Sequence, residues 1–79
     1  MKNANKNKYI EIKNSQQVAP LLQKRRKELG ITQKQLADLS NLSFNGISRM
    51  EVGDSEIKLS NLIKIGQLLG LKIKIEVED

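Results

Sequence analysis

The middle of the chain, residues 31–53, repeats apolar positions at the spacing of two short helices joined by a turn. Thr32, followed three residues later by Gln35, forms a capping box, which predicts that the first helix begins at Gln33. The positions expected to face the core are Leu36, Ala37, Leu39, Ile47 and Met50. This pattern predicts a helix-turn-helix, the arrangement that places a second helix in the major groove of DNA.

The turn and the second helix have their own signals. Ser40 and Asn41 interrupt the periodicity, and asparagine tolerates the left-handed backbone that such a turn requires. Ser43 is the expected cap of the second helix, and Gly53 is its expected stop. The face turned away from the core is polar and carries Asn45, Ser48 and Arg49. We therefore expect this face to meet a hydrogen-bonding partner.

A longer helix is expected before this pair, over Ser15–Leu29, with Gly30 as its end. Its positions at helical spacing are Leu21, Leu22, Arg25 or Arg26, and Leu29. Pro20 lacks an N–H group, so Gln16–Ala19 form either a separate turn or a strained first turn.

A last helix is expected after the loop that follows Gly53. Ser60 is its expected cap and Gly70 its end. The positions expected to face the core are Leu62, Ile65, Leu68 and Leu69.

The C-terminus changes period from helical to alternating. Apolar side chains at every second position share one face, and they are Leu71, Ile73, Ile75 and Val77, while charged residues occupy the other face. This predicts a β-strand, which needs a partner because a single strand is not stable alone. The partner is its copy in a homodimer, the short alternating stretch of residues 9–13, or both.

Length and composition restrict the function further. The chain has 79 residues, which predicts one small domain whose core gains from dimerisation. Fourteen Lys and Arg against 9 Asp and Glu give a net charge of +5, which favours a polyanionic partner. The sequence contains no cysteine and no histidine, so disulfides, thiolate chemistry and the usual zinc ligands are excluded. We expect a non-enzyme without cofactor or metal.

Residues 1–8 are polar and basic, which predicts a flexible arm. Its lysines either attach to DNA electrostatically or are simply solvated. The N-terminus has no apolar run of the signal-peptide type, and no stretch approaches the length that spans a bilayer. The expected location is the cytoplasm, in association with the bacterial nucleoid.

The motif T-Q-K-Q-L-A, followed by S-F-N-G-I-S-R-M-E-x-G, resembles the Xre/Cro-type family of bacterial and phage repressors over residues 15–70. The resemblance implies a mainly α, lambda-repressor-like domain of four helices. Mapped by position, it implies base contacts by Phe44, Asn45, Ser48 and Arg49, and phosphate contacts by Gln33, Ser43 and Lys58. It also implies a structural salt bridge between Arg26 and Glu51, which assigns Arg26 to the interior rather than to a basic patch.

The chemistry of these positions leaves alternatives open. Arg49 is able to pair with guanine and Asn45 with adenine, although contacts to phosphate or water alone are the alternative. Phe44 either touches a thymine methyl or covers the edge of the core. Gly46 either allows close approach to DNA or is simply tolerated in a packed helix. Lys58 is either a backbone contact or a solvated loop residue.

A short helical domain that ends in a dimerising strand, residues 71–79, resembles the HipB antitoxins. These proteins repress their own operons and bind HipA-type kinase toxins, so the resemblance implies a palindromic operator in double-stranded DNA and a toxin partner. Two alternatives remain, a stand-alone regulator such as a phage repressor or restriction-modification controller, and a protein-interaction module whose strand augments a partner sheet.

Overall fold

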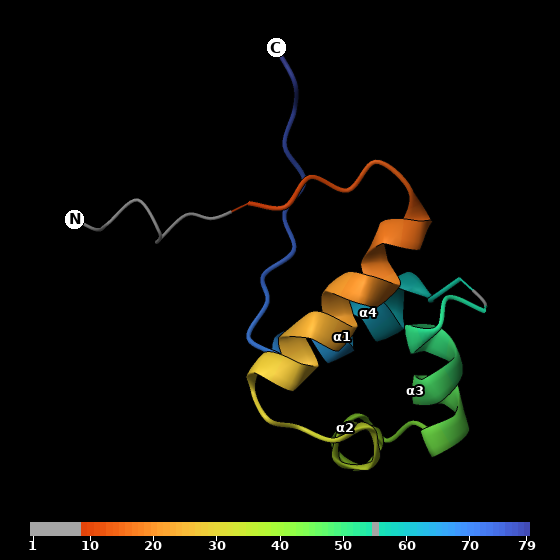
Figure 1. Cartoon of the computed structure of the whole chain (residues 1–79). Coiled ribbons are helices and arrows are strands. Elements are labelled where there is room, and N and C mark those ends of the chain that lie inside the picture. Colours follow the sequence, from red (N-terminus) through yellow and green to blue (C-terminus); the bar gives the residue numbers. More distant parts are fainter. Residues whose placement is uncertain (1–8, 55) are drawn as a thin grey trace.

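The structure is a computed structural model that describes residues 9–54 and 56–79, so the expected N-terminal arm, residues 1–8, lies outside the described part. The described residues form one 3₁₀ turn and four α-helices in chain order (Figure 1). They are η2 (Ser15–Gln17), α1 (Val18–Glu28), α2 (Gln33–Ser40), α3 (Phe44–Glu51) and α4 (Leu59–Leu68). The expected mainly α fold with four helices is confirmed.

The start of α1 resolves the question posed by Pro20. Residues Ser15–Gln17 form a separate 3₁₀ turn, and the α-helix begins only at Val18. Pro20 is thereby the third residue of α1, within the first turn, where backbone N–H groups have no partner inside the helix. A separate turn is therefore observed, but it covers Ser15–Gln17 rather than the expected Gln16–Ala19, because Val18 and Ala19 belong to α1.

The helix-turn-helix follows the predicted boundaries. The Thr32 hydroxyl accepts a hydrogen bond from the Gln35 N–H at 3.0 Å, and the Gln35 side chain accepts one from the Thr32 N–H at 2.8 Å. Asn41 adopts the left-handed backbone at φ 61°, which turns the chain between α2 and α3. The Ser43 hydroxyl then accepts from the Gly46 N–H at 2.9 Å, so the expected cap of α3 is present.

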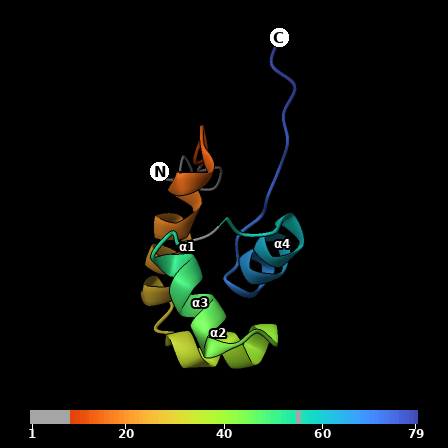
Figure 2. The ribbon, with the colours of Figure 1, turned by 90° about the vertical axis from the view of Figure 1, so that its right-hand side faces the viewer.

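The core lies where α1, α2, α3 and α4 converge (Figures 1 and 2). Its buried apolar side chains are Val18, Leu22, Leu36, Ala37, Ile47, Met50, Ile65 and Leu69. Half-buried side chains pack around them, and these include Ile31, Leu42, Ile57, Leu62 and Leu71. Most of the expected inward positions are thus in the core.

Two of the expected inward positions are wrong. Leu39 and Leu68 are 59% and 37% exposed. Leu39 lies about 100° around the helix from Ser40, and Leu68 about 100° from Leu69, so each is turned away from the buried stripe. The buried position on α2 is taken by Ser40, whose hydroxyl lies 3.3 Å from the Ala37 carbonyl.

The start of α4 also differs from the prediction. Lys58, not Ser60, is the N-cap residue, and its side chain makes no capping hydrogen bond. Ile57 packs against the core directly before it, which fixes the point where the loop turns into the helix. At the other end of α4, Gly70 adopts a left-handed backbone at φ 74°, and the Arg25 side chain donates to the Leu69 carbonyl at 2.8 Å.

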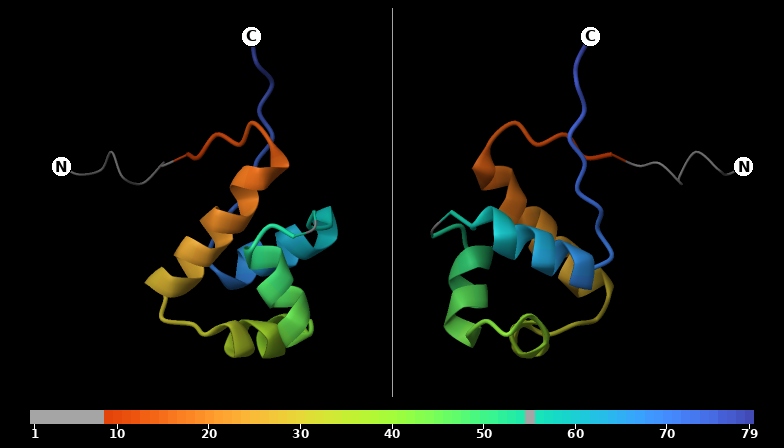
Figure 3. Two further views of the ribbon diagram at one scale, coloured as in Figure 1. Left: turned by 45° about the vertical axis from the view of Figure 1, so that its right-hand side comes forward. Right: turned by 180° about the vertical axis from the view of Figure 1, so that it is seen from behind.

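The C-terminal residues 71–79 leave α4 as an extended segment, and the views of Figure 3 show it running away from the helices. Within residues 9–54 and 56–79 of this single chain no β-strand is formed, either at the C-terminus or over residues 9–13. The predicted strand and the dimer sheet therefore stay predictions. Across the described residues no helix has both the length and the apolar character to span a membrane.

Candidate DNA-reading surface

Helices α2 and α3 lie together at the end of the molecule opposite the C-terminal segment (Figure 1). The inner side of α3 buries Ile47 and Met50, which orients the helix by hydrophobic packing. Asn45 and Arg49 are exposed on its outer side, and Ser48 is half-buried between them. The structure thus brings three of the predicted base contacts onto one accessible face.

Arg49 has one ionic neighbour among the described residues. Its Nε lies 3.8 Å from an Asp54 carboxylate oxygen, and both side chains are more than 60% exposed. An exposed pair at this distance is weak because water screens the two charges. Arg49 is therefore accessible to a ligand in the groove, with Asp54 as its competitor.

Phe44 and Gly46 occupy the first turn of α3. Phe44 is 52% exposed, so half of its ring is left to contact a ligand. A Cβ at Gly46 would lie 3.1 Å from the Ser43 hydroxyl oxygen, a tight contact with the group that caps the helix. The glycine thus leaves room for the cap, a reason that neither sequence-based alternative included.

The predicted phosphate contacts lie at both ends of α3. Ser43 and Lys58 line one shallow hollow with Asn61 at the N-terminal end of the helix. Gln33, at the N-terminus of α2, lies at the other end, where its side-chain amide donates to Glu51 Oε1 at 2.9 Å. N-terminal helix N–H groups favour anions at both places.

A buried ion pair holds α1 against α3. Arg26 donates from Nε to Glu51 Oε2 at 2.7 Å and from Nη2 to Oε1 at 3.0 Å, and the two residues are 7% and 5% exposed. Arg26 also donates to the Ile31 carbonyl at 2.6 Å. The bidentate geometry is that of the expected structural pair, so Arg26 is a structural residue and not part of a basic patch.

The ion pair also sets the charge state of Glu51. Burial raises the pKa of Glu51, but the hydrogen bonds from Arg26 and Gln33 and the charge of Arg26 outweigh it and lower the pKa below its ordinary value. Glu51 is therefore ionised near neutral pH, and it links the structural Arg26 to Gln33 at the edge of the candidate surface.

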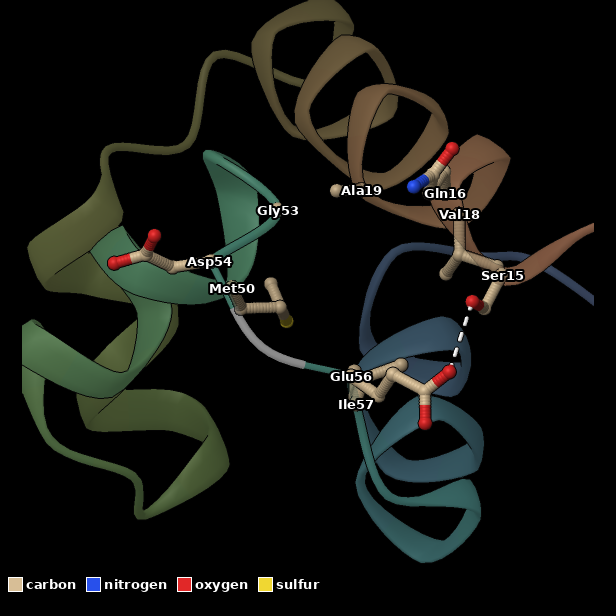
Figure 4. Close-up of a pocket in the computed structure, with 9 residues that line it drawn as sticks. All are labelled: Ser15, Gln16, Val18, Ala19, Met50, Gly53, Asp54, Glu56 and Ile57. Carbon is tan, nitrogen blue, oxygen red and sulfur yellow. Dashed lines mark hydrogen bonds between the residues drawn. The ribbon is translucent and has the colours of Figure 1, made fainter.

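A second hollow lies between the start of α1 and the loop after α3 (Figure 4). Its lining residues include Asp54 and Glu56, and the Ser15 hydroxyl donates to Glu56 at 3.1 Å. None of the predicted DNA contacts lines this hollow, so we place it outside the DNA-reading surface.

Sequence reasoning missed two contacts at this surface. The Gln33 side chain is hydrogen-bonded to Glu51, and Asp54 lies beside Arg49. The Gln33–Glu51 contact joins residues 18 apart and has no local signal in the sequence. The Asp54 contact did have a local signal in the sequence. Asp54 follows Gly53, the expected end of the second helix, and is therefore close in sequence to Arg49 in the last turn of that helix.

The chain is similar to a family of known proteins and to several solved structures. The family model described as "Helix-turn-helix" matches residues 22–75. The restriction-modification controller protein C.Esp1396I, solved as a point mutant, is 32% identical, with a TM-score of 0.68 over 72% of this chain and 74% of its own. A HipB variant, solved in complex with an O2 20-mer, is 25% identical, with a TM-score of 0.77 over 91% of this chain and 100% of its own. HipB in a HipA–HipB–O2–O3 complex matches equally well, at 25% identity and a TM-score of 0.77 over 90% and 100%. No curated protein matches the chain.

The matched region contains all four helices except the first residues of α1, and it carries the capping box, the turn and the outer face of α3. These features indicate a DNA-binding regulator rather than an enzyme. The chain belongs to the Xre/Cro-type helix-turn-helix family of DNA-binding transcriptional regulators.

Proposed function

We propose that this chain is a sequence-specific transcriptional repressor that binds operator DNA as a homodimer. The observation that carries the proposal is the outer face of α3, where Asn45 and Arg49 are exposed while Ile47 and Met50 hold the helix on the core. A symmetric dimer presents two such helices to successive major grooves. The half-sites are then about 34–36 Å apart, or a multiple of it, in a palindromic operator.

The roles within each half-site follow from donor and acceptor patterns. Arg49 reads guanine through two N–H donors, and Asn45 reads adenine through its amide. Ser48 adds a hydroxyl, and the exposed half of Phe44 meets a thymine methyl. Gln33, Ser43 and Lys58 contact phosphates at the two ends of α3 and fix its position in the groove.

We further propose that the protein is the antitoxin of a type II toxin–antitoxin pair that represses its own operon and neutralises a HipA-type kinase. The support is coverage, because the likeness to HipB extends over 91% of this chain and the whole of HipB. HipB has also been solved together with HipA. In this proposal, the C-terminal residues 71–79 are the dimerising strand.

A restriction-modification controller is the second candidate, favoured by the higher identity of 32% to C.Esp1396I. That match leaves about a quarter of each chain uncovered, since it spans 72% and 74% of the two. Both candidates share the same DNA chemistry and differ only in their partner.

Co-expression with the neighbouring gene product separates the two candidates. If the antitoxin proposal is right, the neighbour is a kinase that co-purifies with this chain, and the complex binds the shared promoter more tightly than this chain alone. A neighbouring endonuclease or methyltransferase, with no kinase bound, would favour the controller.

A further inference from the structure

The C-terminal segment is docked at one end and exposed at the other. Leu71 is half-buried against the core and Ile73 is 46% exposed, whereas Ile75 and Val77 are 97% and 91% exposed. Leu71 and Ile73 lie over Gly66, where an added Cβ would be 3.6 Å from Ile73 Cδ1. The outer half of the segment thus presents two apolar side chains that are left almost fully exposed among residues 9–54 and 56–79.

The charged residues of this segment also change sign between its docked half and its exposed half. Lys72 and Lys74 stand in the docked half, while Glu76, Glu78 and Asp79 stand in the exposed half. In an extended segment Lys72, Lys74, Glu76 and Glu78 share the face opposite the apolar side chains. The docked half is basic and its apolar side chains are partly covered, whereas the exposed half is acidic and its apolar side chains are almost fully exposed.

We propose that two copies of this chain pair antiparallel through residues 71–79 with the two-fold axis at Ile75. This proposal rests on the proposed homodimer and specifies its strand register. Lys74 then faces the partner's Glu76, Lys72 faces the partner's Glu78, and Ile73 faces the partner's Val77. Each exposed half lies along the partner's docked half. The pairing therefore sets glutamates opposite lysines and covers apolar side chains that are exposed in a single chain.

Other registers fail on the same residues. An axis at Lys74 places two lysines directly opposite each other, and an axis at Glu76 does the same with two glutamates. An axis at Ile73 sets Lys72 against the partner's Lys74, and parallel in-register pairing sets every charge against its own copy. An axis between two residues moves apolar side chains opposite charged ones.

A groove beside the docked half has room for the partner's strand. It has a volume of about 450 Å³ and runs between residues 9–12 and residues 71–74, and its apolar lining includes Ile10, Ile12, Leu21 and Leu62. Lys72 and Lys74 line it, and Lys74 Nζ lies 5.7 Å from the centre of the Tyr9 ring. A groove lined by lysines and by apolar side chains is complementary to a strand that has Ile75 and Val77 on one face and glutamates on the other.

Single cysteines test the register directly, because the chain has no cysteine of its own. Residues paired across an antiparallel ladder have Cα atoms about 4.5–5.5 Å apart, within disulfide range, whereas diagonal neighbours are about 7–8 Å apart. The full chain is oxidised mildly with one cysteine at 73, 74, 75, 76 or 77. We expect Ile75→Cys to give the most covalent dimer, and Ile73→Cys to cross-link with Val77→Cys when the two are mixed but not alone.

Leu39→Cys is the matched control, because this exposed side chain is on α2 at the opposite end of the molecule (Figure 1). A maximum at position 74 or 76, or equal cross-linking at every position, would overturn the register while the dimer itself stands. Sedimentation equilibrium of the unmodified protein tests whether the homodimer forms at all. A monomer at micromolar concentration would overturn both the homodimer and the register, whatever the DNA titration shows.

Charge exchange supplies a test without covalent trapping. Lys74→Glu and Glu76→Lys should each raise the dimer dissociation constant by about tenfold or more, because each creates two like-charge pairs across the axis. An equal mixture of the two variants should form heterodimers at the original affinity, since every pair is then opposite in charge. Lys24→Glu, a charge reversal on α1, is the control. Failure of the mixture to associate would contradict the proposed facing of residues 74 and 76.

Discussion

Arg49 is the residue on which the proposed base reading depends most. It is exposed on the outer side of α3, and its ionic neighbour Asp54 is 3.8 Å away and similarly exposed. Arg49→Ala should lower the preference for operator over scrambled DNA by about 1–3 kcal/mol, or roughly 5–150-fold, and leave the fold unchanged. Competition titrations measure this ratio. Lys24→Ala removes the same charge from α1 and should weaken both DNAs alike, if at all. Unchanged discrimination in Arg49→Ala would remove this residue from the reading face.

Single residues also show where sequence reasoning ended. Asn41 was predictable, because few residues tolerate its left-handed backbone, and it adopts φ 61°. The exposure of Leu39 was not predictable. Its hydrophobicity favours an inward position, whereas the buried face of α2 includes Ser40 instead. A helix of two turns has too few positions to fix the direction of its stripe. Packing against α3 and α4 decided it.

At the scale of the elements, the cap of α3 is the local feature with the clearest effect. The Ser43 hydroxyl accepts from the Gly46 N–H at 2.9 Å. Ser43→Ala should lower the free energy of unfolding by about 1 kcal/mol, because this N–H group loses its side-chain partner. Chemical denaturation measures the change, and Ser43→Asp, which keeps an acceptor, should recover most of it. A Ser43→Ala variant as stable as the original chain would mean that water replaces the cap without cost.

The contact between α1 and α3 predicts a pH dependence. The pKa of Glu51 is lower in the folded chain than in the unfolded one, so its contribution to stability is present above about pH 4.5 and is lost as the pH falls through the folded pKa. Glu51→Gln should cost about 3–5 kcal/mol at pH 7, because it leaves the charge of Arg26 buried without its partner.

The two chains should therefore converge in stability as the pH falls toward 3. Urea unfolding from pH 7 to pH 3 measures both curves. A constant difference across this range would show that Glu51 does not titrate with folding.

The elements differ in how far the sequence determines them. The capping box at Thr32 and the Arg26–Glu51 pair were predictable, the first from local chemistry and the second from the family resemblance. The start of α4 was not predictable, because Ile57, which packs against the core, sets the N-cap two residues before the serine that resembles a cap. The alternating segment 71–79 forms no strand within the described residues, and the pairing between two chains that its pattern predicts stays a prediction.

At the scale of the whole molecule, the proposed DNA contacts and the proposed dimer contact lie at opposite ends. Helices α2 and α3 form one end, and the C-terminal segment leaves from the other (Figure 1). A dimer joined through residues 71–79 would thus connect two reading surfaces without covering them. The net charge of +5 then adds to a long-range attraction for DNA that salt screens.

The most direct test of operator reading is a binding titration of the purified protein on its own upstream promoter DNA and on a scrambled sequence, at two salt concentrations. We expect binding to the promoter at least about 10³-fold tighter than to the scramble, with a salt slope that corresponds to several phosphate contacts. Equal, weak and salt-sensitive binding to both DNAs would contradict the account. The charge would then be generic, and a protein-interaction role would replace the repressor.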